Sequence, residues 1–169
     1  MASSFIARAD GRFEGGGLAF RCALGRGGVV AAAQKREGDG ASPIGVWPVR
    51  RVYYRADKGP APETGVPAVA LRPQDGWCDD LAEADYNRLV PLPCPFSHER
   101  MWRADPVYDL VVELGYNDNP VVPGKGSAIF LHVAREGYPP TEGCVALAEA
   151  DLRAVLKHLG GGSVIEIRA

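Results

Sequence analysis

One cysteine and one histidine have the types and spacing that covalent acyl chemistry requires. Cys144 follows His132 across a turn formed by residues 137–140, which contain two prolines. The prolines stiffen the returning chain, so that the thiol can come to lie beside the imidazole. A free thiol is largely un-ionised at neutral pH, and a neighbouring imidazole stabilises the thiolate. The two residues are therefore a candidate nucleophile and general base.

Two features near Cys144 would assist this chemistry. Gly143 lets backbone amides approach a reacting carbonyl, where they could donate to an oxyanion. A helix predicted over residues 149–159 begins just downstream, and the positive end of its dipole would stabilise a thiolate. Spacing alone favours a buried thiol and a strand histidine with no chemical role.

Apolar alternation predicts the strands in the first part of the chain. Residues 18–24 alternate large apolar with small or charged side chains, and residues 29–33 are predicted to pair with them as a hairpin. Residues 46–54 form a further predicted strand, broken at Pro48. Residues 77–102 are predicted to be a long irregular stretch of the kind that forms a lid or the wall of a site.

The elements that must position the candidate pair come later in the chain. Residues 108–116 and 128–134 show the strongest strand alternation, and His132 lies near the end of the second strand. Leucines and a valine at helical spacing predict the only convincing helix, over 149–159. Residues 164–168 form a closing strand. We therefore expect a mainly β fold with one clear helix near the C-terminus.

Composition limits the class of protein. The chain has 169 residues, of which 46% are hydrophobic and 24% charged, which predicts a single globular domain over residues 1–169. A net charge of -2 excludes a nucleic-acid partner held by bulk charge. No apolar run approaches the roughly 18 residues that a membrane-spanning helix needs, and charged residues near the N-terminus argue against a signal peptide.

The cysteines and histidines do not have the spacing of a metal site. The sequence contains no C-x-x-C pair and no H-x-x-x-H pair, so we expect neither a structural metal nor a cofactor. Without a leader, free thiols are the default expectation. Cys78 and Cys94 could form a disulfide if the protein were exported.

Three segments, in order, carry a family resemblance. They are residues 38–47 (GDGASPIGVW), 127–132 (SAIFLH) and 141–147 (TEGCVAL). They resemble signatures of the L,D-transpeptidase catalytic domain, the YkuD-like family. The resemblance implies a β-sandwich-like domain whose cysteine attacks the amide before the terminal D-alanine of a peptidoglycan stem tetrapeptide. An acyl-enzyme forms, and an amine or water then captures the acyl group.

The resemblance also implies roles for individual residues. Cys144 matches the family nucleophile, and His132 matches the histidine that withdraws its proton and later protonates the leaving amine. The carbonyl of Val133 would orient the histidine ring. Backbone amides around Gly143 and Cys144 would hold the oxyanion.

The chain departs from the family pattern close to the nucleophile. Glu142 stands where many members have a histidine, and a carboxylate there disfavours a thiolate unless it faces an arginine. Ala146 stands where many members have arginine or asparagine, and the interval between His132 and Cys144 is shorter than usual. We therefore expect altered substrate contacts. The candidates for substrate binding are Thr141, Glu142, Gly143, Tyr116 and His98.

Several of these assignments have a simpler alternative. His98 also fits an exposed loop histidine, and Tyr116 also fits a core residue. Asp79 and Asp80 could bind the ammonium group of a diamino acid or could belong to a solvated acidic loop.

The sequence leaves three functional hypotheses. The first is an L,D-transpeptidase, a transferase that remodels the cell wall. The second is a cytosolic L,D-carboxypeptidase that trims muropeptides, and the third is a non-catalytic peptide-binding module. The expected partner is a peptidoglycan stem peptide or muropeptide, and the expected state is a monomer. The resemblance favours the periplasm or cell envelope, whereas the apparent lack of a leader favours the cytoplasm.

Overall fold

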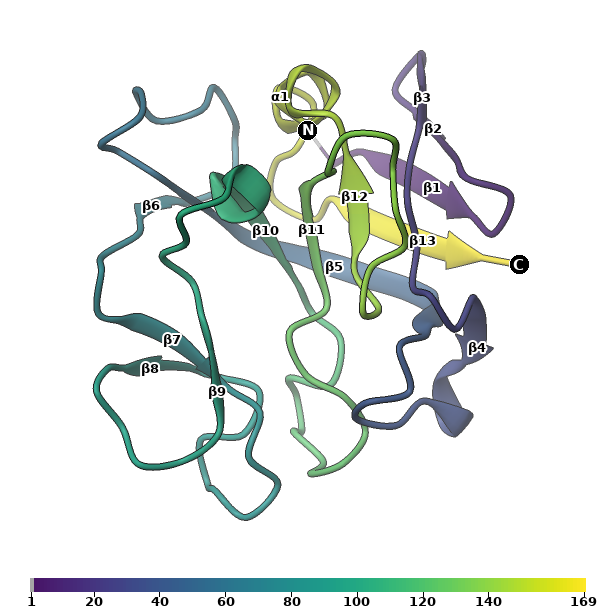
Figure 1. Ribbon diagram of the computed structural model, residues 1–169. Helices are drawn as coiled ribbons and strands as arrows, with labels where there is room; N and C mark the ends of the chain where they lie inside the picture. The colour runs from purple at the N-terminus through teal and green to yellow at the C-terminus, as the bar shows by residue number, and fades with distance from the viewer. Residues whose placement is uncertain (1) are drawn as a thin grey trace.

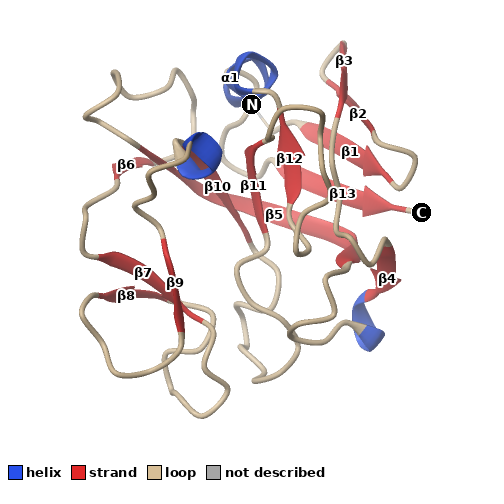
Figure 2. Ribbon diagram, viewed as in Figure 1, coloured by secondary structure: helices blue, strands red, loops and turns tan. Residues whose placement is uncertain are grey.

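The computed structural model describes residues 2–169, whose strands form a large sheet and a separate small one (Figures 1 and 2). The large sheet contains β1 (Ser4–Arg8), β2 (Arg12–Gly15), β3 (Leu18–Arg21), β4 (Val29–Ala31), β5 (Ser42–Tyr54), β6 (Ala68–Ala70), β10 (Leu110–Leu114), β11 (Phe130–Val133), β12 (Val145–Leu147) and β13 (Val164–Arg168). The small sheet contains β7 (Asp75–Cys78), β8 (Leu89–Pro91) and β9 (His98–Arg100). The helices are α1 (Glu149–Leu156) and the 3₁₀ turns η1 (Ala32–Gln34) and η2 (Pro106–Tyr108).

The large sheet closes on itself in the manner of a barrel. Its strand order is β12-β11-β10-β5-β13-β1-β2-β3, and β4 and β6 add to β5. A bridge between Ala23, just after β3, and Ala146 in β12 connects the two ends of this order. Side chains from both halves, such as Phe5 and Ile165 from one and Leu131 from the other, share a single apolar core. The mainly β architecture with one α-helix is therefore confirmed.

Strand β5 joins the two halves and is not broken at Pro48. It runs for 13 residues across the molecule (Figure 1). Its antiparallel pairing with β13 ends at Pro48, and its antiparallel pairing with β10 begins at Val49. The missing N–H of the proline therefore falls where the strand changes partners, so the expected break does not occur.

The predicted hairpin between residues 18–24 and 29–33 was wrong. Strand β3 pairs antiparallel with β2, whereas β4 pairs parallel with the start of β5. The intervening chain is held by bridges from Ala23 to Ala146 and from Gly25 to Thr141. Alternation identifies a strand but does not choose its partner, and these long-range bridges carry the chain away from a local hairpin.

Residues 77–102 are not irregular, because most of the small sheet lies within them. Strand β7 is central and pairs antiparallel with both β8 and β9. Trp77 and Met101 from this unit pack with Phe130 and Tyr108 in a second apolar cluster. Figure 1 shows the small sheet set beside the large one. The strands have only three or four residues each, and prolines lie between β8 and β9, which hides their periodicity in the sequence.

Strand β11, which carries His132, lies where the sequence predicts a strand, whereas β12, which follows Cys144, was not predicted. Strand β11 places Leu131 and Val133 in the main core and Phe130 on the opposite face. Helix α1 begins at Glu149 and buries Leu152, Val155 and Leu156. Strand β13 has the predicted bounds. Within residues 2–169 no helix is long and apolar enough to cross a membrane.

Candidate active site

A cleft of about 570 Å³ is lined by residues from both the large and the small sheet. Strand β11 and the chain before β12 provide one wall, and the small sheet with η2 provides another. The side chains that matter for chemistry in its lining are Cys144, His132, Tyr108, Glu99, His98 and Asp79. The prediction that residues 77–102 form the wall of a site is consistent with this lining.

Cys144 and His132 face this cleft because of the register between β11 and β12. The two strands are parallel, with Leu131 opposite Val145 and His132 opposite Ala146. Leu131 and Val145 face the main core. Since neighbouring side chains alternate between faces, His132 in β11 and Cys144, the residue before β12, project to the other side. Among residues 2–169, no hydrogen bond joins the Cys144 sulfur to the His132 ring.

The His132 ring has the orientation and protonation of a general base. Its Nδ1 lies 3.0 Å from the carbonyl oxygen of Val133, as the family resemblance implies. A carbonyl oxygen can only accept, so Nδ1 carries the proton and Nε2 keeps its lone pair. The Tyr108 ring packs edge-on against the imidazole, with 5.4 Å between ring centroids. Burial lowers the pKa of His132 to about 4, which leaves the ring neutral at pH 7.

Cys144 is a protonated thiol at rest. Its Sγ donates to the carbonyl oxygen of Ala128 at 3.1 Å and accepts from the N–H of Phe130 at 3.4 Å. Burial raises the pKa of Cys144 to about 12, and the nearby Glu99 adds to this effect. The Phe130 N–H and the Lys35 ammonium act in the opposite direction and lower the pKa.

The prediction that the dipole of the helix stabilises a thiolate at Cys144 was wrong. Strand β12 stands between Cys144 and the first residue of α1, Glu149. The residues on the buried face of α1 belong to the main core, whereas Cys144 belongs to the cluster on the other side of β11. The dipole effect falls off within the first turn of a helix, so it does not reach the sulfur.

A tight turn precedes Cys144. The Thr141 hydroxyl donates to the carbonyl oxygen of Cys144 at 2.6 Å and accepts from the N–H of Gly143 at 3.1 Å. The Gly143 amide is thus already engaged and is not a free oxyanion donor, whereas the Cys144 N–H has no acceptor among residues 2–169. Gly143 has φ +136°, and a Cβ there would lie 2.9 Å from the carbonyl oxygen of Ala41. Only glycine fits this position without strain.

Comparison with known proteins assigns the chain to a family. Residues 5–167 match YkuD, the L,D-transpeptidase catalytic domain. The chain belongs to the L,D-transpeptidase catalytic domain family. This family acts on peptidoglycan peptides. No curated protein is similar enough in sequence to count as a match.

Solved L,D-transpeptidases are similar to this chain at low sequence identity. L,D-transpeptidase 3 from Mycobacterium tuberculosis, in complex with a faropenem-derived adduct, is 12% identical with a TM-score of 0.50, over 99% of this chain and 60% of that one. L,D-transpeptidase 1 from Mycobacterium tuberculosis is 14% identical with a TM-score of 0.45, over 99% and 60% of the two chains. This chain therefore spans about 60% of the length of these proteins.

Glu142, which replaces a histidine of many L,D-transpeptidases, faces an arginine. The Arg26 Nε lies 2.9 Å from its carboxylate, both side chains are exposed, and Glu142 lines the cleft. The sequence argument required such a partner for a carboxylate beside the thiol. The carboxylate that raises the pKa of Cys144 is that of Glu99, which accepts a hydrogen bond from the Tyr108 hydroxyl. Burial raises the pKa of Glu99 against the effect of that hydrogen bond.

The other predicted substrate contacts have different environments. His98 lines the cleft from β9, and its Nδ1 lies 2.8 Å from the Phe96 carbonyl oxygen and 3.3 Å from the Cys94 sulfur. Tyr116 is buried in the main core and donates to the Lys125 carbonyl oxygen at 2.5 Å. Tyr116 therefore lies outside the lining of the cleft, and the core alternative describes its environment.

The acidic residues and cysteines that the sequence analysis names within residues 77–102 also have different environments. Asp79 lines the cleft and accepts from the Ser97 hydroxyl at 2.6 Å, whereas Asp80 lies outside the lining. Cys78 is buried and Cys94 half-buried, and both are free thiols. Within residues 2–169, no group of three or more His, Cys, Asp or Glu side chains is arranged to hold a metal ion.

Sequence reasoning missed several residues around the nucleophile. Ser42 is fully buried, donates to the carbonyl oxygen of Gly143 at 2.8 Å and accepts from the N–H of Gly25 at 2.9 Å. It lies in the first of the three family-like segments, which was the available signal. Glu99 and Tyr108 have no comparable signal, because their contact with the pair depends on the packing of the small sheet.

Proposed function

We propose that this chain is a cysteine-dependent L,D-transpeptidase that acts on peptidoglycan stem tetrapeptides through an acyl-enzyme intermediate. The observation that carries the proposal is the placement of Cys144 and His132 on one face of adjacent strands, lining one cleft. The family match supplies the substrate class. Each residue has one role: Cys144 is the nucleophile and His132 the general base and acid.

In the first step the proton and the nucleophile move together. The Sγ of Cys144 attacks the carbonyl carbon of the amide that precedes the terminal D-alanine, and its proton passes to Nε2 of His132. The thiol is protonated and the imidazole neutral at rest, so a preformed ion pair is not required. The Val133 carbonyl accepts from Nδ1 and stabilises the imidazolium. The Cys144 N–H is the available donor for the tetrahedral oxyanion.

In the second step the tetrahedral intermediate collapses. The C–N bond breaks, the amine of D-alanine takes the proton from His132, and the acyl group remains on sulfur as a thioester. An acceptor amine then attacks the thioester carbonyl and gives its proton to His132. The C–S bond breaks, the new amide leaves, and the proton returns to Cys144. Protons and electron pairs balance over the cycle without a cofactor.

A product analysis tests this function against its alternatives. Purified protein is incubated with a disaccharide tetrapeptide, with and without an excess of a second D-amino acid, and the products are separated by mass. The expected product is the exchanged tetrapeptide, with none formed by Cys144→Ala. Cys94→Ala is the matched control, since Cys94 lies beside His98 at the cleft but has no assigned role.

Other product patterns would contradict the proposal. Tripeptide alone, formed in the presence of the D-amino acid, identifies an L,D-carboxypeptidase. A protein that binds the tetrapeptide but converts none of it, with no difference between wild type and Cys144→Ala, is a non-catalytic module.

A further inference from the structure

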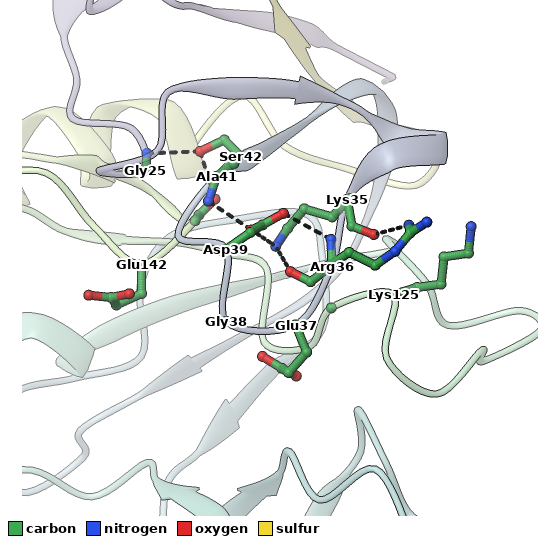
Figure 3. A network of polar contacts seen from close by, with 12 residues as sticks. Gly25, Lys35, Arg36, Glu37, Gly38, Asp39, Ala41, Ser42, Lys125 and Glu142 are labelled. Atoms are coloured by element: carbon green, nitrogen blue, oxygen red, sulfur yellow. Dashed lines mark hydrogen bonds and ion pairs between the residues drawn. The ribbon is translucent and has the colours of Figure 1, made fainter.

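Among the residues that the structure describes, two arginines are the only permanently charged cations in the lining of the cleft. Arg103 follows the small sheet, and Arg135 comes just after β11. Apart from the histidines, the other charged side chains in the lining are carboxylates: Glu37, Asp79, Glu99 and Glu142. Figure 3 shows Glu37 and Glu142 with their carboxylates outside the network around Lys35. An anionic group of a ligand is therefore attracted to one part of the cleft, where the arginines lie.

Both arginines contact the same aspartate, which leaves an excess positive charge. Arg103 donates two hydrogen bonds of 2.8 Å to the Asp105 carboxylate, from Nε and from one terminal nitrogen. These hydrogen bonds hold the pKa of Asp105 well below its usual range, so the carboxylate is ionised at neutral pH. The charges of Arg103 and Asp105 therefore cancel. Arg135 adds a positive charge that no second carboxylate within residues 2–169 neutralises.

Arg135 is oriented by Asp105 but keeps its donors available. One of its terminal nitrogens lies 3.3 Å from an Asp105 oxygen that Arg103 already occupies, and its side chain is 55% exposed. In the described part of the chain, this guanidinium has no hydrogen bond of ordinary length. A guanidinium presents its N–H donors in a planar fork that matches the two oxygens of a carboxylate. Arg135 can therefore bind a carboxylate of a ligand in the cleft.

A series of contacts connects the arginines to His132. The Arg103 Cζ lies 5.4 Å from the centroid of the Tyr108 ring, and the His132 imidazole packs edge-on against the same ring. Burial is the main cause of the low pKa of His132, and the two guanidinium groups add to it. In the proposed mechanism His132 protonates the amine of the leaving D-alanine. The carboxylate carbon of D-alanine lies only about 2.5 Å from that nitrogen, so the carboxylate is released beside the arginines.

We propose that Arg135 binds the terminal carboxylate of the D-alanine in the donor peptide, with Asp105 and Arg103 as its positioning residues. This inference rests on the proposed function of the cleft. In the exchange reaction the incoming D-amino acid places its amine where the amine of D-alanine was, so its carboxylate occupies the same site. The site therefore selects donor peptides that end at this residue and acceptors that have a free α-carboxylate.

The test measures binding without the reaction. In the Cys144→Ala background, calorimetry compares the disaccharide tetrapeptide with its C-terminal carboxamide. We expect the carboxylate form to bind about tenfold more tightly, because the carboxamide loses the charge-assisted hydrogen bonds. Adding Arg135→Gln should abolish this preference, so that both peptides bind as weakly as the carboxamide. Arg135→Lys keeps the charge but not the fork and should keep part of the preference.

A second measurement uses the active enzyme. Arg135→Gln should raise the KM of a D-amino acid acceptor about tenfold and leave the KM of the corresponding D-amino acid amide unchanged. Equal changes for the two acceptors would contradict a shared carboxylate site.

Controls separate this contact from a general effect of losing an arginine. Arg153→Gln is the matched control, since Arg153 is also exposed, lies 3.1 Å from one oxygen of Glu149 and is outside the cleft lining. Melting temperature shows that each variant is folded. A preference for the carboxylate that survives in Arg135→Gln, or that is lost equally in Arg153→Gln, overturns the inference. A preference that depends on Arg135 in a protein without exchange activity refutes the proposed function but supports the carboxylate site.

Discussion

The hydroxyl of Ser42 donates a 2.8 Å hydrogen bond to the carbonyl oxygen of Gly143. The bond connects the first residue of β5 to the residue before Cys144, although the two are far apart in the sequence. The hydroxyl oxygen of Ser42 also accepts a hydrogen bond from the N–H of Gly25. One buried side chain therefore holds three segments together behind the thiol.

Ser42→Ala should destabilise the protein and slow acyl transfer. The change leaves the buried Gly25 N–H and Gly143 carbonyl without their partner, which costs about 1–3 kcal/mol of unfolding free energy. We expect kcat to fall more than KM rises, because the turn bearing Cys144 loses its support. Denaturant titration and steady-state kinetics measure the two effects. Ser4→Ala, at an exposed position, is the control, and equal behaviour of the two variants would refute the role of Ser42.

Gly143→Ala should disable the site more than strain alone can explain. The new Cβ would meet the Ala41 carbonyl oxygen at 2.9 Å, on a backbone with φ +136°. Gly137→Ala is the matched control, since Gly137 has φ +79° but nothing within 4 Å of an added Cβ. Both variants carry a backbone penalty of about 1–2 kcal/mol. Only Gly143→Ala should also lose exchange activity, and retention of activity there would contradict the described turn.

The buried His132 should make the protein less stable as pH falls. Its pKa is about 4 in the folded state against 6.5 in the unfolded chain. Above pH 6.5 neither state binds the proton, and below it the unfolded state binds the proton first. The free energy of unfolding should therefore decrease by about 3 kcal/mol between pH 6.5 and pH 4 from this group alone.

Chemical denaturation of wild type and His132→Asn at several pH values measures this contribution. The difference between the two proteins should change with pH over that window and stay constant above it. Parallel curves throughout would show that His132 titrates normally in the folded protein.

A carbapenem should form a covalent adduct with Cys144. Its strained amide mimics an acyl donor, and opening it transfers the acyl group to sulfur. Intact-mass analysis should show the addition of one inhibitor, with peptide mapping to Cys144. The adduct should persist in Cys94→Ala and be absent from Cys144→Ala. An unmodified wild-type protein after long exposure would argue against an activated thiol.

Local patterns in the sequence were sufficient for β11, which carries His132, but not for β12, which follows Cys144. The alternation in β11 predicts that His132 and Phe130 share a face, because alternation follows directly from strand geometry. The helix and the final strand are also local features. Strand pairing is not a local feature, since β4 has the composition of a hairpin partner but pairs with β5. The prediction for Pro48 was wrong because the consequence of its missing N–H depends on which strand lies alongside.

The surroundings of the thiol were less predictable for the same reason. The family-like segments identify Cys144 and His132 as candidates from their order in the chain. Lys35 and Glu99 affect the sulfur only because β4, β5 and the small sheet place them near it. The effect of a charge depends on its distance in space, and the sequence does not give the distance between residues that are remote along the chain.

The division of the cleft between two sheets bears on how such a protein can diversify. His132 belongs to β11 and Cys144 to the chain leading into β12, whereas Asp79, His98 and Glu99 come from β9 and its neighbours. Within residues 2–169, no strand pairing joins the small sheet to the large one. Mutations in the small sheet can therefore reshape what the cleft accepts while the reacting atoms keep their register, so that new specificities can evolve without rebuilding the catalyst.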